Sequence, residues 1–406
     1  MDRDDLALEI RDSLEKVYPH SLDHGVIVAR AGRRRQRRRI GAIGAAFLLV
    51  AVAAIVIAVV GGSSQTPFGP PVVQASARVV LEGHVVGTAA TEGDYLWVLT
   101  CSTRCGGSPA NFERSRGMLV KIDNRTGEIV ASTSVKDPGV VAVGEGGVWT
   151  ASFDGVVTRF DPQTAQAVGS VHLSLPKPVG SNYPEAFEFL PNNVVVGEGA
   201  VWVSTAREYV AQIDPKTIEL VRIIPTHFGV SGLAVGGGSV WLSAELFGLA
   251  RIDPRTGKRG PTRPIEAADG RRLSMDYLAV ANGSLWARGG WAVPHGPTHD
   301  YVPSPNGKSL GLARVDLRTG AVKQVVSFDG YIWLHAVSGG RLWLSGRDSR
   351  AGSRDVYVLD RGAKKVTLAA RLAKPGTIVG AVGTALWVAR PGQVLERYEI
   401  PVRKEG

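Results

Sequence analysis

The sequence is poor in residues and motifs that mark common catalytic sites. Only two of its 406 residues are cysteine, Cys101 and Cys105, which excludes a Cys-rich zinc module and allows at most one disulfide within the chain. No P-loop, Gly-x-Ser-x-Gly elbow or His-Glu-x-x-His motif is present. These absences exclude the usual nucleotide, serine-hydrolase and zinc-protease sites, and we expect no cofactor.

The charge of the chain is basic but gives little support for nucleic-acid binding. The net charge is +10, and residues 1–39 hold ten Lys or Arg against seven Asp or Glu. The remainder is therefore only mildly basic, whereas nucleic-acid-binding domains concentrate positive charge on one face. We expect no nucleic-acid partner.

A tryptophan-centred phrase repeats along the chain. Each copy has a Gly-containing turn before the Trp, which lies in an apolar, β-branched run. The spacings are 52, 53, 39, 45, 57 and 44 residues, in or just above the range of a four-stranded propeller blade. The repeat predicts an all-β, seven-bladed β-propeller with one Trp on the second strand of each blade: Trp97, Trp149, Trp202, Trp241, Trp286, Trp343 and Trp387.

Turn signals separate the predicted strands. In blade two we expect strands at 140–143, 148–152, 156–160 and 167–173, because apolar residues alternate there between Gly-rich and Asp-Pro turns. The Asp-x-x-Thr turn recurs in several blades, and Asp can bond its own backbone two residues on. Blade seven lacks a fourth strand at the C-terminal end, so residues 77–82 are predicted to supply it and close the ring.

The N-terminal part predicts a membrane anchor. An Arg cluster ends residues 1–39, a basic tail with a short amphipathic helix, and residues 40–60 form an uncharged run of 21 residues. Such a helix is about 31 Å long and matches a bilayer core of about 30 Å. The positive-inside rule puts the tail in the cytoplasm, where it could meet a partner. Residues 61–76 read as a linker, and 77–406 as an extracytoplasmic propeller at the plasma membrane.

The irregular parts of the repeat fall on one face of the predicted ring. If Trp marks the second strand, connections between the first and second strands and between the third and fourth share one face, here called the turn face. The other connections share the opposite face, the insertion face. Long loops in compact domains are commonly functional. The insertion face carries all four long departures, at residues 101–117, 174–191, 288–311 and 346–354.

Blades four to six bring polar and aromatic residues toward this face. Aromatic walls with a few convergent polar groups are typical of ligand sites. Counting back ten residues from each Trp aligns the innermost strands, and blades five and six alone place large polar or aromatic residues there. We predict a ligand-binding arc made of His227, Asp276, Tyr277, Trp291, His295, His299, Asp300, Tyr301, Trp333 and His335.

Specific chemistry in this arc has simpler alternatives. His295, His299 and Asp300 lie in a Gly/Pro loop without a distant third ligand, so we predict no metal site. His335 could act as a general acid or base, or be a hydrogen-bonded core histidine. No residue is assigned a catalytic role. Cys101 and Cys105 are expected to form a disulfide if the propeller lies in an oxidising compartment.

The phrase around Trp202, followed by Ile213-Asp214-Pro215-Lys216-Thr217, resembles the bacterial streptogramin-lyase-like and YVTN-type propellers. The resemblance covers about residues 77–400 and implies the fold. In the lyase, a His and a magnesium-assisted site act on one face, but those positions have no residue-by-residue match here.

The sequence therefore favours a membrane-anchored, extracytoplasmic binding module that recognises a ligand or protein, as a surface sensor or scaffold. A lyase-type enzyme acting at the channel mouth is the alternative, and a purely structural assembly subunit is a third.

Overall fold

A computed structural model describes twelve segments of the chain, all in the unit Gly69–Gly406. These segments are residues 70–102, 115–174, 191–205, 208–244, 248–266, 272–295, 300–303, 310–328, 331–347, 354–360, 366–391 and 393–401. The predicted tail and span at 40–60 lie outside them. Within the described segments, no helix is long and apolar enough to cross a membrane, and every regular element is a strand.

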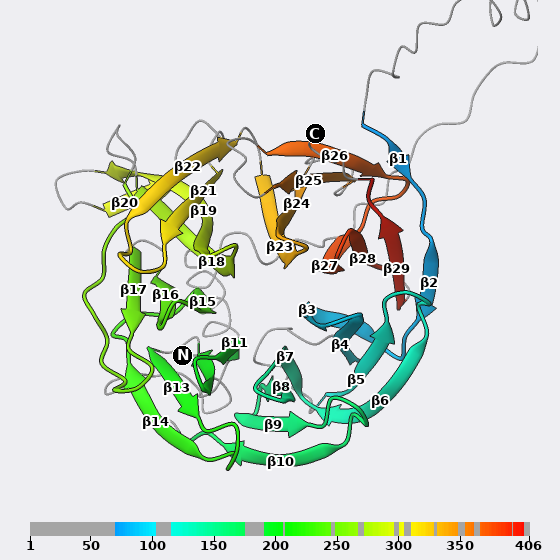
Figure 1. Ribbon diagram of the computed structural model, residues 1–406, viewed down its shortest axis with the longest axis horizontal. Coiled ribbons are helices and arrows are strands. Elements are labelled where there is room, and N and C mark those ends of the chain that lie inside the picture. Colours follow the sequence, from blue (N-terminus) through cyan, green and yellow to red (C-terminus); the bar gives the residue numbers. More distant parts are fainter. Residues whose placement is uncertain are drawn as a thin grey trace, which may run out of the picture. The chain divides into compact units, whose positions relative to one another are not determined.

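Seven sheets, antiparallel except for the pairing of one short strand in blade six, surround a common axis, which confirms the predicted seven-bladed propeller (Figure 1). Blades one to three contain β3 (His84–Glu92), β4 (Tyr95–Cys101), β5 (Arg116–Asp123) and β6 (Ile129–Lys136); β7 (Pro138–Gly144), β8 (Gly147–Ser152), β9 (Val156–Phe160) and β10 (Ala167–His172); and β11 (Pro191–Gly197), β12 (Ala200–Thr205), β13 (Tyr209–Ile213) and β14 (Leu220–Pro225). Blade four contains β15 (Gly232–Val235), β16 (Val240–Ala244) and β17 (Gly248–Ile252). Blades five to seven contain β18 (Arg272–Ala281), β19 (Ser284–His295), β20 (Asp300–Pro303), β21 (Leu310–Asp316) and β22 (Val322–Phe328); β23 (Tyr331–Ser338), β24 (Arg341–Arg347), β25 (Asp355–Leu359), β26 (Thr367–Leu372) and β1 (Val72–Val73); and β27 (Thr377–Val382), β28 (Ala385–Arg390), β29 (Val394–Glu399) and β2 (Ala77–Val80).

The seven repeated Trp residues all lie on the second strand of their blades, as predicted. Their side chains are between 0% and 5% exposed. The buried apolar residues form seven clusters, and each cluster joins two neighbouring blades. Aromatic side chains of this size contribute much of the apolar area that packing removes from water, so the Trp repeat is the core between blades.

The repeated Asp residue stabilises the turn after the third strand through local hydrogen bonds. In five blades one carboxylate oxygen accepts the amide hydrogens of the residues two and three positions on, at 2.7–3.2 Å. These bonds lower the pKa of every one of the five carboxyls, because they favour the charged form. The five residues are Asp123, Asp161, Asp214, Asp253 and Asp316.

The two ends of the described chain meet in blade seven. β2 pairs with β29 and forms the outermost strand, so the predicted ring closure is confirmed. The structure adds a second contact: β1, within the predicted linker range 61–76, pairs in parallel with β26 of blade six. A short segment therefore crosses from blade six to blade seven at the rim (Figure 1).

Blade four departs from the regular blade. Its described sheet has three strands. Its outer edge meets residues 259–263 through two isolated bridges, Leu249 to Arg263 and Ile252 to Arg259, and a hydrogen bond from the amide of Gly260 to the carbonyl of Arg251. Pro261 interrupts this segment, and proline lacks the amide hydrogen that a regular ladder requires.

Neighbouring blades are also joined by polar side chains on the third strand, opposite each Trp. In blades one to three these are Lys121, Arg159 and Gln212. Their side chains donate to the carbonyl after the turn Asp of the next blade, on Pro162, Pro215 and Pro254, at 2.7, 3.2 and 3.0 Å. We call each such bond a latch. The neutral amide of Gln212 makes the same bond as the two cations, so a latch does not require a charge.

Candidate functional site

Bulges on the innermost strands determine which residues leave the sheet ladder near the axis. One residue is skipped in each of blades two, three, five, six and seven. A bulge re-aims a side chain and commonly occurs next to functional sites. The skipped residues are Gly139, Asn192, Asp276, His335 and Val379. In blade six the residue at this position is therefore His335, and not Trp333 as counting back from Trp343 suggested.

Arg288 on β19 is the centre of a buried polar group between blades five and six. Its side chain is only 5% exposed, and in the ladder it lies opposite Tyr277 on β18. Burial raises the pKa of the Tyr277 hydroxyl, while the positive charge of Arg288 opposes that shift. Tyr277 is therefore uncharged at neutral pH.

His335 on β23 belongs to the same group. Its Nε2 lies 2.7 Å from Oγ of Ser345 on β24. Burial, and then the charge of Arg288, lower the pKa of His335 to about 4, while the backbone of Ile378 in blade seven acts to raise this pKa. At neutral pH the ring is uncharged and hydrogen-bonded to Ser345, as expected of a core histidine.

Sequence reasoning missed Arg288 and Ser345, although the repeat contains a signal. Arg288 lies two residues after the blade Trp, where the other blades carry Leu, Ala or Ser. It is the one charged residue at that position of the repeat, so aligning the second strands as well as the innermost ones would have found it.

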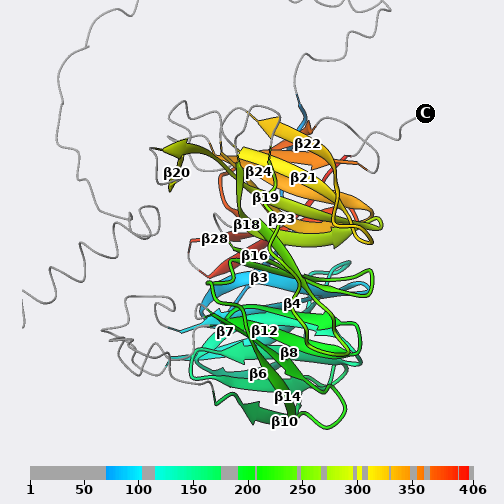
Figure 2. The same cartoon turned by 90° about the vertical axis from the view of Figure 1, so that its left-hand side faces the viewer.

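The blade-five insertion is partly an extension of the sheet. β19 continues beyond the blade, and β20 pairs back onto it, with His295 opposite Asp300 and Pro294 opposite Tyr301. In side view β20 projects from the body of the ring (Figure 2). Trp291 precedes this extension on β19 and lies opposite Leu273 of β18. We call residues 291–295 of β19 and 300–303 of β20 the blade-five arm. His299 lies outside the described residues.

The predicted arc is only partly assembled by the described residues. Tyr277 and His335 both lie close enough to Arg288 for its positive charge to lower their pKa values. His227 is exposed, with a left-handed φ of 64°, in the connection from β14 to β15 between blades three and four. The backbone path is described, but the side chains are not, for Asp276, Trp291, His295, Asp300, Tyr301 and Trp333. The arc as a ligand site stays a prediction.

The sequence also led to predictions about a metal site and a disulfide. They contain no group of three or more His, Cys, Asp or Glu side chains arranged to hold a metal ion. Cys101 is buried at the end of β4. Cys105 lies outside the described residues, so the disulfide stays a prediction.

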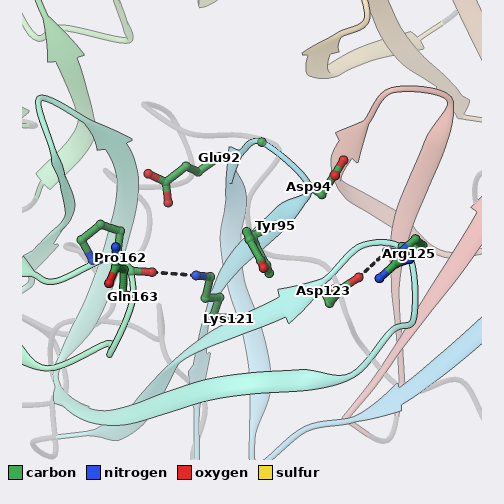
Figure 3. Close-up of a pocket in the computed structure, with 9 residues that line it drawn as sticks. Glu92, Asp94, Tyr95, Lys121, Asp123, Arg125, Pro162 and Gln163 are labelled. Carbon is green, nitrogen blue, oxygen red and sulfur yellow. Dashed lines mark hydrogen bonds between the residues drawn. The ribbon is translucent and has the colours of Figure 1, made fainter.

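A cavity of about 470 Å³ opens on the turn face, at the junction of blades one and two (Figure 3). Sequence reasoning did not identify this cavity, because its walls come from turns of two different blades. It is lined by Glu92, Gly93, Asp94, Tyr95, Lys121, Asp123, Arg125, Pro162 and Gln163.

Comparisons with known proteins identify the fold and no family. No family model matches the chain, and no curated protein matches its sequence. A chain from the crystal structure of the mitotic checkpoint complex is similar over 91% of this chain and 99% of its own, with a TM-score of 0.54 and 9% identity. BamB from Moraxella catarrhalis is similar over 78% of this chain and 86% of its own, with a TM-score of 0.43 and 13% identity. At such identities the first likeness shows the propeller fold alone.

Proposed function

We propose that this chain is a membrane-anchored, extracytoplasmic propeller that binds a protein or ligand through its insertion face. The observation that carries the proposal is the contrast between the two faces. The described connections on the turn face are short and repetitive, and in blades one to three latches join them to the next blade. Every long departure from the repeat is on the insertion face, where the blade-five arm extends the sheet. Loops on a rigid scaffold commonly provide binding residues.

The geometry of His335 supports binding over lyase chemistry. A general acid or base works best with a pKa near the working pH. His335 has a pKa of about 4, and its Nε2 is already hydrogen-bonded to Ser345. The resemblance to streptogramin-lyase-like and YVTN-type propellers is, on this proposal, one of fold.

Crosslinking from the two faces tests the proposed binding surface. A photoreactive amino acid is introduced in the full-length chain at exposed positions of the insertion face, Ser174, His227 and Pro391, and at exposed positions of the turn face, Arg125, Lys216 and Arg318. We expect one discrete crosslinked species from the first set and none from the second. Equal crosslinking from both faces, or from neither, would contradict the proposed surface.

Cysteine labelling tests the anchoring and its direction. A membrane-impermeant maleimide is applied to intact cells expressing Lys216→Cys, in the propeller, or Ser13→Cys, in the tail. The unmodified chain, with Cys101 and Cys105, provides the background. We expect Lys216→Cys to react in intact cells and Ser13→Cys only after lysis. The reverse pattern, or recovery of the chain in the soluble fraction, would contradict the topology.

A further inference from the structure

The cavity at the junction of blades one and two surrounds the Lys121 latch, but its remaining walls, volume and charges are not needed to form that hydrogen bond. One wall comes from the turn between β3 and β4, with Glu92 and Tyr95, and the other from Pro162 and Gln163 of blade two (Figure 3). Lys121 on β5 lies between them. Its volume of about 470 Å³ is in the range of small-molecule sites, which spans about 300 to 1,000 Å³.

Blade one differs from blade two at the repeat position two residues before the Trp. In blade two this residue is Gly147, and a Cβ there would meet Nε of Arg159 at 2.9 Å. The Arg159 side chain therefore occupies that space. In blade one the same position is Tyr95, and the ammonium of Lys121 lies 3.9 Å from the centre of its ring. The aromatic ring holds the cation to one side, and the adjoining space is the cavity.

Lys121 is buried without an opposite charge beside it. The residue is 8% exposed, and its Nζ donates to the carbonyl of Pro162 at 2.7 Å. No carboxylate of the described residues lies within ion-pair distance of it. The rings of Tyr95 and Trp97, at 3.9 and 5.4 Å from the ammonium, offset only part of the cost of burying this charge, and Gln212 shows that a neutral side chain makes the same latch. The lysine charge therefore suits a negatively charged group that enters the cavity.

The cavity also carries free negative charge. Asp123 uses one carboxylate oxygen in its own turn, through the amides of Arg125 and Thr126. The Glu92 side chain makes no hydrogen bond or ion pair among the described residues, and Figure 3 draws it on the side of Pro162 and Gln163, apart from Lys121. Two opposite charges therefore lie on the same cavity without neutralising one another.

We propose that this cavity binds a small zwitterion of the α-amino-acid class. The ligand carboxylate pairs with Lys121 and its ammonium with Glu92, while its side chain lies along Tyr95 and Pro162. A simple anion would be repelled by Glu92, and a simple cation by the buried Lys121. A molecule with both charges neutralises both residues, and charge-assisted hydrogen bonds of this kind are roughly twice as strong as neutral ones. The proposal does not depend on the membrane topology or on the insertion face.

Three probes that share the leucine side chain but carry different charges test the proposal on the full-length chain in detergent. L-leucine carries both charges, N-acetyl-L-leucine only the carboxylate, and L-leucinamide only the ammonium. Dissociation constants are measured by ligand-observed NMR titration. We expect L-leucine to bind and each blocked analogue to bind at least tenfold more weakly. No binding of L-leucine, or an analogue binding as well as L-leucine, overturns the proposal.

Matched variants locate the site. Lys121→Gln retains the latch, as Gln212 does in blade three, and Glu92→Gln changes a half-buried side chain with no partner to lose. Each should weaken L-leucine binding at least tenfold. Arg159→Gln, the equivalent change in blade two, should leave it unchanged. Unaltered binding in Glu92→Gln, which does not touch the core, overturns the assignment even if Lys121→Gln fails to fold. Equal weakening by Arg159→Gln overturns it as well.

Discussion

Nε1 of Trp387 lies 2.8 Å from Oδ1 of Asn124, in a buried hydrogen bond between residues 263 positions apart. It joins blade seven to blade one, next to the place where β2 and β29 close the ring. Arg397, which lies opposite Trp387 on the third strand, bonds Ser76 and Glu399 and makes no latch to blade one among the described residues. In blades two to four the Trp indole instead donates to a Gly carbonyl five residues before it.

Asn124→Leu should weaken this junction. The substitution removes the acceptor and leaves a buried indole N–H without a partner, which costs about 1–3 kcal/mol. The free energy of unfolding, measured by denaturant titration, should fall by that amount. Arg125→Ala, at the exposed neighbouring residue of the same turn, is the control and should have little effect. A variant as stable as the unmodified chain would show that the hydrogen bond contributes nothing to closure.

His335 should make stability depend on pH in a defined window. Its folded pKa of about 4 lies below the ordinary value of 6.5, so the unfolded chain binds the proton first as pH falls. Its contribution is complete above pH 6.5 and is lost progressively between 6.5 and about 4, by up to about 3 kcal/mol. In His335→Gln, melting temperatures should lose this dependence. His84→Gln, at an exposed histidine, should retain it, and an identical profile in His335→Gln would refute the assignment.

The Asp turns should add a second, more acidic transition. The turn hydrogen bonds hold the pKa of Asp161 below 3.8, so their contribution is present above that pH and is lost as pH falls through the lowered value. Asp161→Asn keeps an acceptor oxygen but does not titrate, so its melting temperature should fall less between pH 4 and pH 2. Asp94→Asn, whose side chain makes no turn bond, serves as the control. If the melting temperatures of Asp161→Asn and Asp94→Asn fall equally between pH 4 and pH 2, the Asp161 turn does not cause the acid transition.

The latch between blades two and three should tolerate a neutral donor but not a hydrocarbon. Arg159→Gln places in blade two the side chain that blade three already uses, so little stability should be lost. Arg159→Leu leaves the carbonyl of Pro215 without this donor and should cost about 0.5–1.5 kcal/mol. The melting temperatures of the two variants, each compared with the unmodified chain, measure these losses of stability. If Gln is as damaging as Leu, the positive charge itself stabilises the junction.

Truncation should distinguish the two N-terminal strands. A chain beginning at residue 70 keeps β1 and β2, one beginning at 75 loses β1, and one beginning at 83 loses both. Removing β2 exposes an edge of β29 and the apolar surface that Val79 and Leu81 cover, with exposures of 5% and 2%. Limited proteolysis should therefore cleave the third chain much faster than the first, with the second close to the first. Equal resistance of all three would contradict the role of β2 in closure.

The sequence alone determined the blade count, the second-strand position of each Trp and the Asp turns. These features depend on interactions within a few residues, such as the bond from Asp161 to the amide of Thr164, or on the alternation that half-buried strands impose. Closure by residues 77–82 could be predicted because blade seven had too few strands. In the candidate site, Tyr277 and His335 were placed in neighbouring blades by the same repeat.

Only the tertiary structure decided the contacts between blades. The bulge at His335 in blade six and the pairing of β1 with blade six have no local signature. The cavity at Lys121 likewise depends on how Tyr95 and a turn of blade two pack together. Such contacts join residues far apart in sequence, and their geometry follows from packing between whole sheets.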